Sequence, residues 1–145
     1  MFKKIIFFFL LVLLFSCSKN NIEKVVLEPT DEEMAISTYE EAIEALKIGD
    51  AFFATKKFKE VESLMPQSAW AAKASLMASY SEYSRNAYDS SIFGLERHIK
   101  NYPADENIPY AHYKIANCYY EQRLDEKKDL EPLLKAKEKF EFIMQ

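Results

Sequence analysis

Residues 58–66 (FKEVESLMP) and 95–103 (LERHIKNYP) share one pattern, in which an apolar residue opens the stretch and another precedes a closing proline. The two prolines, Pro66 and Pro103, lie 37 residues apart. Apolar residues at three- and four-residue steps predict an amphipathic helix in each stretch, and the proline ends that helix. At the same offset the apolar positions of the two stretches and of the helices before them align: Phe58 with Leu95, Met65 with Tyr102, and Leu46 with Tyr83.

Each of these stretches is preceded by another stretch with helical spacing. Thr30 and Glu33 have the spacing of a capping box, so a first helix is expected to begin there and to end at Gly49-Asp50. The sequence predicts four helices, each with an apolar stripe. The first two stripes are Tyr39, Ile43 and Leu46, and Ala51, Ala54, Phe58, Val61 and Met65. The third helix begins after the capping residue Ser68, carries Ala72, Leu76, Tyr80 and Tyr83 and ends at Arg85-Asn86, and the fourth carries Ile92, Leu95, Ile99 and Tyr102.

A third unit begins at Ile108-Pro109, and after a charged segment at 122–129 its stripe continues through Leu133, Ala136, Phe140 and Ile143. Helix pairs repeated at a period slightly above 34 residues are typical of tetratricopeptide-like arrays, in which each pair covers the apolar stripe of the next. We therefore predict an all-α fold, a tetratricopeptide-like helix-pair solenoid of about two and a half repeats over residues 31–145. No polar capping helix follows the last stripe, and the repeat domain is expected to be C-terminally incomplete.

The N-terminus has the pattern of an export signal. Lys3 and Lys4 precede eleven apolar residues, 5–15, which are too few for a membrane-spanning helix of roughly 20 residues. Leu14-Phe15-Ser16-Cys17 resembles a bacterial lipobox, which implies cleavage after Ser16 and a covalent diacylglycerol and fatty acyl chain on Cys17. We expect a lipoprotein signal peptide at 1–16 and a flexible tether at 17–30. The alternative is an ordinary secretory signal with an incidental cysteine.

Composition excludes several function classes. The chain has 145 residues and a formal net charge of −4, which argues against nucleic acid as a partner. Two Gly, two Cys and two His leave no Gly-rich phosphate loop and too few ligands for a structural zinc site. No catalytic motif is present, and His98, His112 and Cys118 are expected to be packed side chains. We therefore expect a protein that is not an enzyme and that uses no metal or other cofactor.

Aromatic residues on the first helix of each pair are the candidate binding residues. In tetratricopeptide arrays these helices line the concave surface, where Tyr and Trp offer large apolar faces and hydrogen-bonding tips. The alternative is that most of these rings belong to the core between helices. The candidate peptide groove consists of Trp70, Tyr80, Tyr83, Tyr110 and Tyr113.

The lipobox and three stretches, 39–42 (YEEA), 66–80 (PQSAWAAKASLMASY) and 102–113 (YPADENIPYAHY), together resemble the BamD family. These are tetratricopeptide lipoproteins of the outer-membrane β-barrel assembly machinery. The resemblance implies a periplasmic scaffold anchored by lipid to the outer membrane of a Gram-negative bacterium. Its implied partners are the barrel-inserting subunit BamA, accessory lipoproteins and unfolded β-barrel proteins that end in an aromatic residue. The alternative function is a tetratricopeptide adaptor lipoprotein in cell-envelope or cell-wall coordination.

Overall fold

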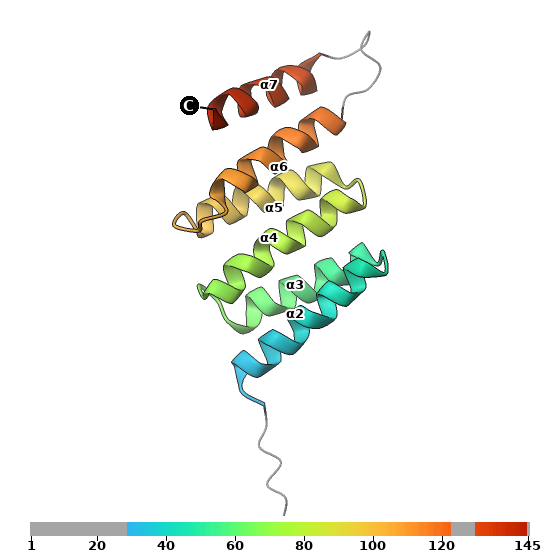
Figure 1. The fold of residues 1–145 in the computed structure, drawn as a ribbon, viewed down its shortest axis with the longest axis vertical. Coiled ribbons are helices and arrows are strands. Elements are labelled where there is room, and N and C mark those ends of the chain that lie inside the picture. Colours follow the sequence, from blue (N-terminus) through green and yellow to red (C-terminus); the bar gives the residue numbers. More distant parts are fainter. Residues whose placement is uncertain (1–28, 123–129, 145) are drawn as a thin grey trace, which may run out of the picture.

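The computed structural model describes residues 29–122 and 130–144, which form six helices stacked in sequence order (Figure 1). The predicted signal peptide and most of the tether, with Ser16 and Cys17, and most of the charged segment at 122–129 lie outside the described residues. The helices are α2 (Asp31–Lys47), α3 (Ala51–Leu64), α4 (Ala69–Ser84), α5 (Tyr88–Asn101), α6 (Ile108–Glu121) and α7 (Glu131–Ile143).

Local sequence sets the first three helix starts. Thr30 and Glu33 form the predicted capping box at α2, with the Glu33 amide donating to Thr30 Oγ1 at 3.2 Å. Asp50 accepts from the Phe53 amide at the start of α3, and Ser68 accepts from the Ala71 amide at the start of α4. The α2–α3 turn passes through Gly49 with φ of +86°, a backbone conformation that glycine adopts without strain.

Successive helices pack as pairs, α2 with α3, α4 with α5 and α6 with α7, and each pair packs on the next. The first helices of neighbouring pairs also contact one another, α2 with α4 and α4 with α6. Within the described ranges the second helices α3, α5 and α7 make no such contact with one another. The stack therefore curves toward α2, α4 and α6, which line its concave face. The predicted all-α, tetratricopeptide-like architecture is confirmed.

The core is built around small side chains. In α2 the buried positions are Ala35, Thr38, Ala42 and Ala45. The larger Tyr39, Ile43 and Leu46 of the predicted stripe pack around the core and are half-buried. Small residues in the seam let two helix backbones approach closely, and the larger side chains then fill the space on either side. The first four residues of the stripe predicted for α3, Ala51, Ala54, Phe58 and Val61, are all buried, whereas Met65 is half-buried and caps the helix after its last residue.

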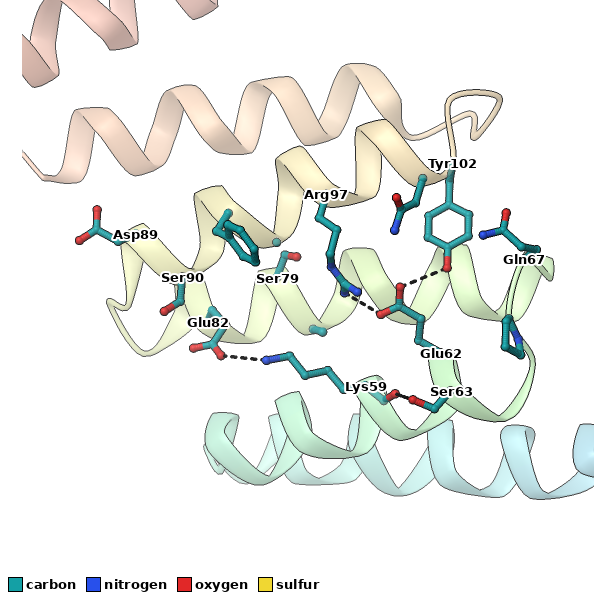
Figure 2. Close-up of a pocket in the computed structure, with 15 residues that line it drawn as sticks. Lys59, Glu62, Ser63, Gln67, Ser79, Glu82, Asp89, Ser90, Arg97 and Tyr102 are labelled. Atoms are coloured by element: carbon teal, nitrogen blue, oxygen red, sulfur yellow. Dashed lines mark hydrogen bonds and ion pairs between the residues drawn. The ribbon is translucent and has the colours of Figure 1, made fainter.

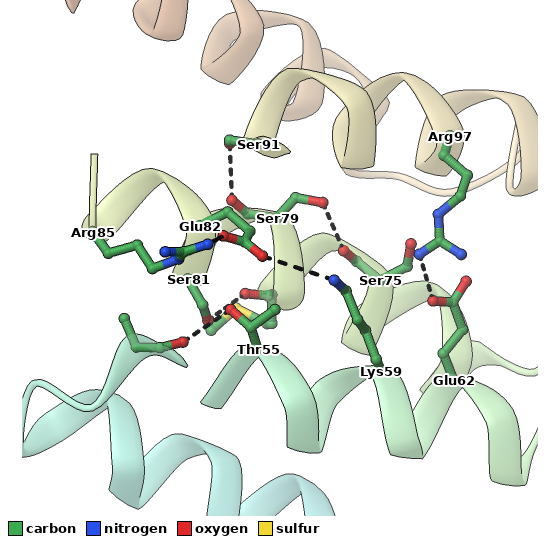
Figure 3. A network of polar contacts seen from close by, with 12 residues as sticks. Thr55, Lys59, Glu62, Ser75, Ser79, Ser81, Glu82, Arg85, Ser91 and Arg97 are labelled. Carbon is green, nitrogen blue, oxygen red and sulfur yellow. Dashed lines mark hydrogen bonds and ion pairs between the residues drawn. The ribbon is translucent and has the colours of Figure 1, made fainter. Parts of the chain in front are cut away.

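A polar seam joins α4 to α5. Ser91 Oγ donates to the backbone oxygen of Ser79 at 2.8 Å, and Ser79 Oγ donates within α4 to the Ser75 oxygen at 3.0 Å (Figure 3). A Cβ atom at Gly94 would collide with Ser79 Oγ, so glycine permits the close approach of the two helices.

Among the described helices, none combines the length and hydropathy that crossing a membrane requires.

Candidate binding surfaces

Helix α4 exposes side chains along one narrow face. Most of α4 is buried, because α2, α3, α5 and α6 all contact it. The side chains left partly or fully exposed recur at three- and four-residue steps, which places them on one side of the helix. This side faces the concave surface and consists of Trp70, Lys73, Met77, Tyr80 and Ser84, with Tyr83 beside it, and Ala69 is exposed at the start of the helix.

Four of the five predicted groove residues lie together on this concave surface. Tyr80 and Tyr83 on α4 and Tyr110 on α6 surround the ammonium of Lys114, which lies 5.2, 4.1 and 5.7 Å from the three ring centroids. The ring of Tyr113 lies 6.5 Å from that of Tyr110. A lysine over several aromatic faces is stabilised by cation–π attraction, so this cluster is both aromatic and positively charged.

Trp70, the fifth predicted residue, belongs to a second cluster nearer the start of α4. Its ring packs edge-on against Tyr39 of α2 at 5.5 Å, and Lys73 Nζ lies 5.6 Å from Trp70 and 5.8 Å from Tyr39. The two clusters repeat one arrangement, a lysine held over rings from adjacent first helices. The sequence reasoning missed Tyr39, Lys73 and Lys114, although Lys73 lies three residues after Trp70 and Lys114 four residues after Tyr110, within reach on one helix face.

Two lysines on the concave surface are not neutralised by ion pairs among the described residues, although the charge of Glu121 acts on the nearby Tyr83. Neither Lys73 nor Lys114 has an ion pair within the described part of the chain, whereas Lys57 and Lys59 on α3 both do. Burial raises the pKa of the Tyr83 and Tyr110 hydroxyls, so both phenols are neutral hydrogen-bond donors at physiological pH. Tyr110 and Tyr113 expose 38% and 46% of their surface, which leaves ring faces available to a ligand.

A cleft lies on the opposite, convex face. It has a volume of about 770 Å³ and lies between α3 and α5, with α4 as its floor (Figure 2). Arg97 of α5 reaches across it to Glu62 of α3 at 2.6 Å, and the Tyr102 hydroxyl donates to the same carboxylate at 3.1 Å. Burial, helped by the Glu62 charge, raises the pKa of Tyr102 to about 12.

A second carboxylate in this cleft is also neutralised. Glu82 of α4 pairs with Arg85 at 2.6 Å and with Lys59 of α3 at 3.7 Å (Figure 3). Lys59 with Glu82 and Arg97 with Glu62 therefore pair across the helices of the cleft, and these two pairs join the first repeat to the second. This arrangement is typical of a structural network between repeats rather than of a ligand site.

The remaining chemistry-bearing side chains are packed, as predicted. His98 and Cys118 are fully buried, and His112 is half-buried with its ring 5.0 Å from that of Phe142. Burial raises the pKa of the Cys118 thiol, which keeps it protonated and unreactive. Across 29–122 and 130–144 no three His, Cys, Asp or Glu side chains are grouped so that they could hold a metal ion.

The chain is similar in sequence to proteins that share one name. The chain is 35% identical to the outer membrane protein assembly factor BamD of Caulobacter vibrioides over 105 residues, which cover 72% of this chain and 33% of that protein. It is 28% identical over 75 residues to the protein of the same name in Xylella fastidiosa, covering 52% of this chain and 26% of that protein. The chain thus spans about a third or less of the length of these relatives.

The family comparison covers the whole helical region. Residues 31–145 match the sequence profile of the YfiO family, described as outer membrane lipoproteins. The match begins at the first residue of α2 and includes both clusters of the concave surface. The chain therefore belongs to the YfiO family of outer membrane lipoproteins.

Proposed function

We propose that this protein is a lipid-anchored periplasmic scaffold subunit of the outer-membrane β-barrel assembly machinery. In this role it binds partner subunits and nascent barrel segments and performs no chemistry. The observation that carries the proposal is the concave surface, where Tyr80, Tyr83 and Tyr110 surround Lys114 and Tyr113 lies beside them. Family membership and the similarity to two proteins named outer membrane protein assembly factor BamD support it.

The ligand that suits this surface is an extended peptide. A helical-repeat groove accepts a chain without secondary structure of its own, and open ring faces bind apolar side chains at little cost in side-chain entropy. The strip along α4 places two such clusters in one line, at Trp70 and at Tyr80. An unfolded β-barrel strand, with alternating apolar residues and an aromatic end, would contact both.

The anchor is the second part of the proposal. We infer that the chain is cleaved after Ser16, that Cys17 carries a diacylglycerol and a fatty acyl chain, and that residues 17–30 connect the lipid to the repeat domain. Each buried methylene contributes about 0.8 kcal/mol, so three chains hold the protein firmly to a membrane. The outer membrane is the site we propose, in agreement with the family.

Depletion of the protein in its own organism tests the function. A subunit of the assembly machinery should lower many outer-membrane β-barrel proteins at once, and affinity capture should recover the barrel-inserting subunit. A chain with Cys17→Ala should fractionate with soluble proteins, and it serves as the control for the anchor. Normal barrel levels, with capture of cell-wall proteins only, would instead indicate an adaptor in cell-wall coordination and contradict the proposal.

A further inference from the structure

The turn between α2 and α3 exposes two large apolar side chains. Ile48, which follows the last residue of α2, is 82% exposed, and Phe52, in the first turn of α3, is 71% exposed. Between them, a Cβ atom placed on Gly49 would meet nothing within 4 Å, so the turn stands clear of the neighbouring helices. Large apolar side chains that are exposed close together mark a contact with another molecule or with a membrane.

Two cations lie beside Phe52 at this end of the stack. The α2–α3 and α4–α5 turns lie on the same side of Figure 1, and Arg85, which caps the end of α4, places its guanidinium carbon 5.9 Å from the centroid of the Phe52 ring. Arg85 also pairs with Glu82 of its own helix. Lys56 is exposed one helical turn after Phe52 and, unlike Lys57, has no ion pair within the described part of the chain.

The chemistry of the turn fits the interfacial region of a membrane. Aromatic rings are enriched at the level of the lipid headgroups, and long basic side chains reach from apolar surroundings to the phosphates. Asp50, the acidic residue of the turn, accepts from the Phe53 amide at 3.0 Å and caps α3, so its charge already has a partner. Apolar side chains bordered by Lys56 and Arg85 therefore favour a lipid surface that carries anionic phosphates.

The turn can reach the membrane that would hold the anchor. Helix α2 has 17 residues and is about 25 Å long, so the turn lies that far from the start of the helix. The proposed tether at 17–30 spans at most about 50 Å when it is fully extended. A single lipid anchor on such a tether limits the distance of the domain from the membrane but does not set its orientation. A second contact is needed for that.

We propose that Ile48 and Phe52 insert into the interfacial region of the membrane, with Lys56 and Arg85 at lipid phosphates, and so set the orientation of the helical stack. The depth is that of an interfacial anchor, about 5 to 10 Å into the boundary between headgroups and acyl chains. Because the contact is at one end of the helices, it leaves both faces of the stack free. This inference rests on the anchor in the proposed function, and it adds a contact between the folded domain and lipid.

Quenching of tryptophan by brominated lipid measures this contact. The full chain, anchored through its own N-terminus, is reconstituted in vesicles of phosphatidylethanolamine and phosphatidylglycerol, with either brominated or ordinary acyl chains. Phe52→Trp adds a reporter at the turn, and the wild-type protein, whose one tryptophan is Trp70, gives the background. We expect the added reporter to lose roughly half of its emission in brominated lipid, because its ring lies at the acyl-chain boundary.

Phe142→Trp is the matched control. Phe142 is 60% exposed and lies near the C-terminal end of α7, on the opposite side of Figure 1 from the α2–α3 turn. The same substitution there should lose little emission beyond the background. Adding Lys56→Gln to the Phe52→Trp chain should reduce the quenching in vesicles with phosphatidylglycerol, because it removes a cation that attracts the anionic headgroups.

The outcomes separate this inference from the proposed function. Stronger quenching of Phe52→Trp than of Phe142→Trp supports the contact. Equal quenching of the two reporters, or stronger quenching of Phe142→Trp, overturns it and leaves the anchor and the peptide groove in place. A chain that does not associate with the vesicles overturns both the contact and the anchor. Quenching that Lys56→Gln leaves unchanged overturns the role of that lysine.

Discussion

Val61 on α3 and His98 on α5 lie 37 residues apart at equivalent positions of successive repeats, and both side chains are fully buried. The first repeat therefore fills this core position with an apolar side chain and the second with an imidazole. Neither ring nitrogen of His98 has a hydrogen-bond partner among the described residues, and the ring packs 5.5 Å from that of Tyr102. Burial lowers the pKa of His98 below 6.5, against the opposing charges of Asp105 and Glu62, with Arg97 adding to the decrease.

The buried imidazole predicts a pH-dependent stability. Well above pH 6.5 His98 is neutral in both the folded and the unfolded chain. As the pH falls below that value, the unfolded chain takes up a proton that the folded chain does not, so the free energy of unfolding decreases. His112, whose pKa burial and Lys139 also lower, contributes in the same direction. Urea unfolding between about pH 7 and 5 measures this decrease.

The variant His98→Leu should reduce that pH dependence. It should also raise the free energy of unfolding at pH 7 by about 1 kcal/mol, because an unpaired buried polar group is replaced by an apolar one. His112→Leu is the comparison, and it should have a smaller effect because His112 is only half-buried. A pH profile for His98→Leu as steep as that of the wild-type protein would contradict the assignment.

Substitution of Gly94 tests how closely α4 and α5 must approach. Alanine ordinarily stabilises a helix by about 1 kcal/mol relative to glycine. Here its Cβ atom would collide with Ser79 Oγ and lie 3.2 Å from Ser79 Cβ, so Gly94→Ala should lower the free energy of unfolding by about 1 to 2 kcal/mol. The double variant Gly94→Ala with Ser79→Ala should recover part of that loss, since it removes the hydroxyl. Equal loss in the single and double variants would show that the collision is not the cause.

The architecture could be predicted from the sequence because its signals are local. The capping box at Thr30 and Glu33, the turn at Gly49 and the prolines Pro66 and Pro103 each act only on the few residues around them. The 37-residue repeat then supplies the same kind of signal more than once. Helix ends were therefore placed to within a few positions. The placement of the candidate groove residues on the first helices could also be predicted, because it follows from the repeat alone, whereas their role in binding stays a prediction.

The charged partners could not be predicted from the same patterns. Lys114 meets Tyr80 and Tyr83 across two helices, and Arg97 meets Glu62 across a separation of 35 residues, so neither contact is visible as a spacing on one helix. In α2 the residues that are buried differ from the stripe that the sequence predicts, for a related reason. Its buried residues are three alanines and Thr38, whose burial depends on how closely two backbones approach rather than on the hydrophobicity of the side chain.

The Glu62–Arg97 pair predicts coupling between the first and second repeats. Glu62→Gln and Arg97→Gln should each lower the free energy of unfolding, and the double variant should lose less than the sum, with a coupling energy of about 1 kcal/mol. Urea unfolding of all four proteins measures this energy. The pair Lys47 and Glu44, which is exposed and lies within one helix, is the control and should give a smaller coupling. Strict additivity at Glu62 and Arg97 would show that the pair does not couple the repeats.

The two faces of the stack should differ in peptide binding. Tyr113→Ser on the concave face and Phe93→Ser on the convex face both remove an exposed ring, with 46% and 71% of the residue surface exposed, so each should change stability by less than about 0.5 kcal/mol. Only Tyr113→Ser should weaken binding of an extended peptide with an aromatic end, by roughly tenfold, because only that ring adjoins Tyr110. Fluorescence anisotropy with both variants checks this difference. Equal weakening by the two variants would mean that the peptide binds through general hydrophobic contact. Weakening by Phe93→Ser alone would show that the peptide binds instead at the convex cleft, which Phe93 lines.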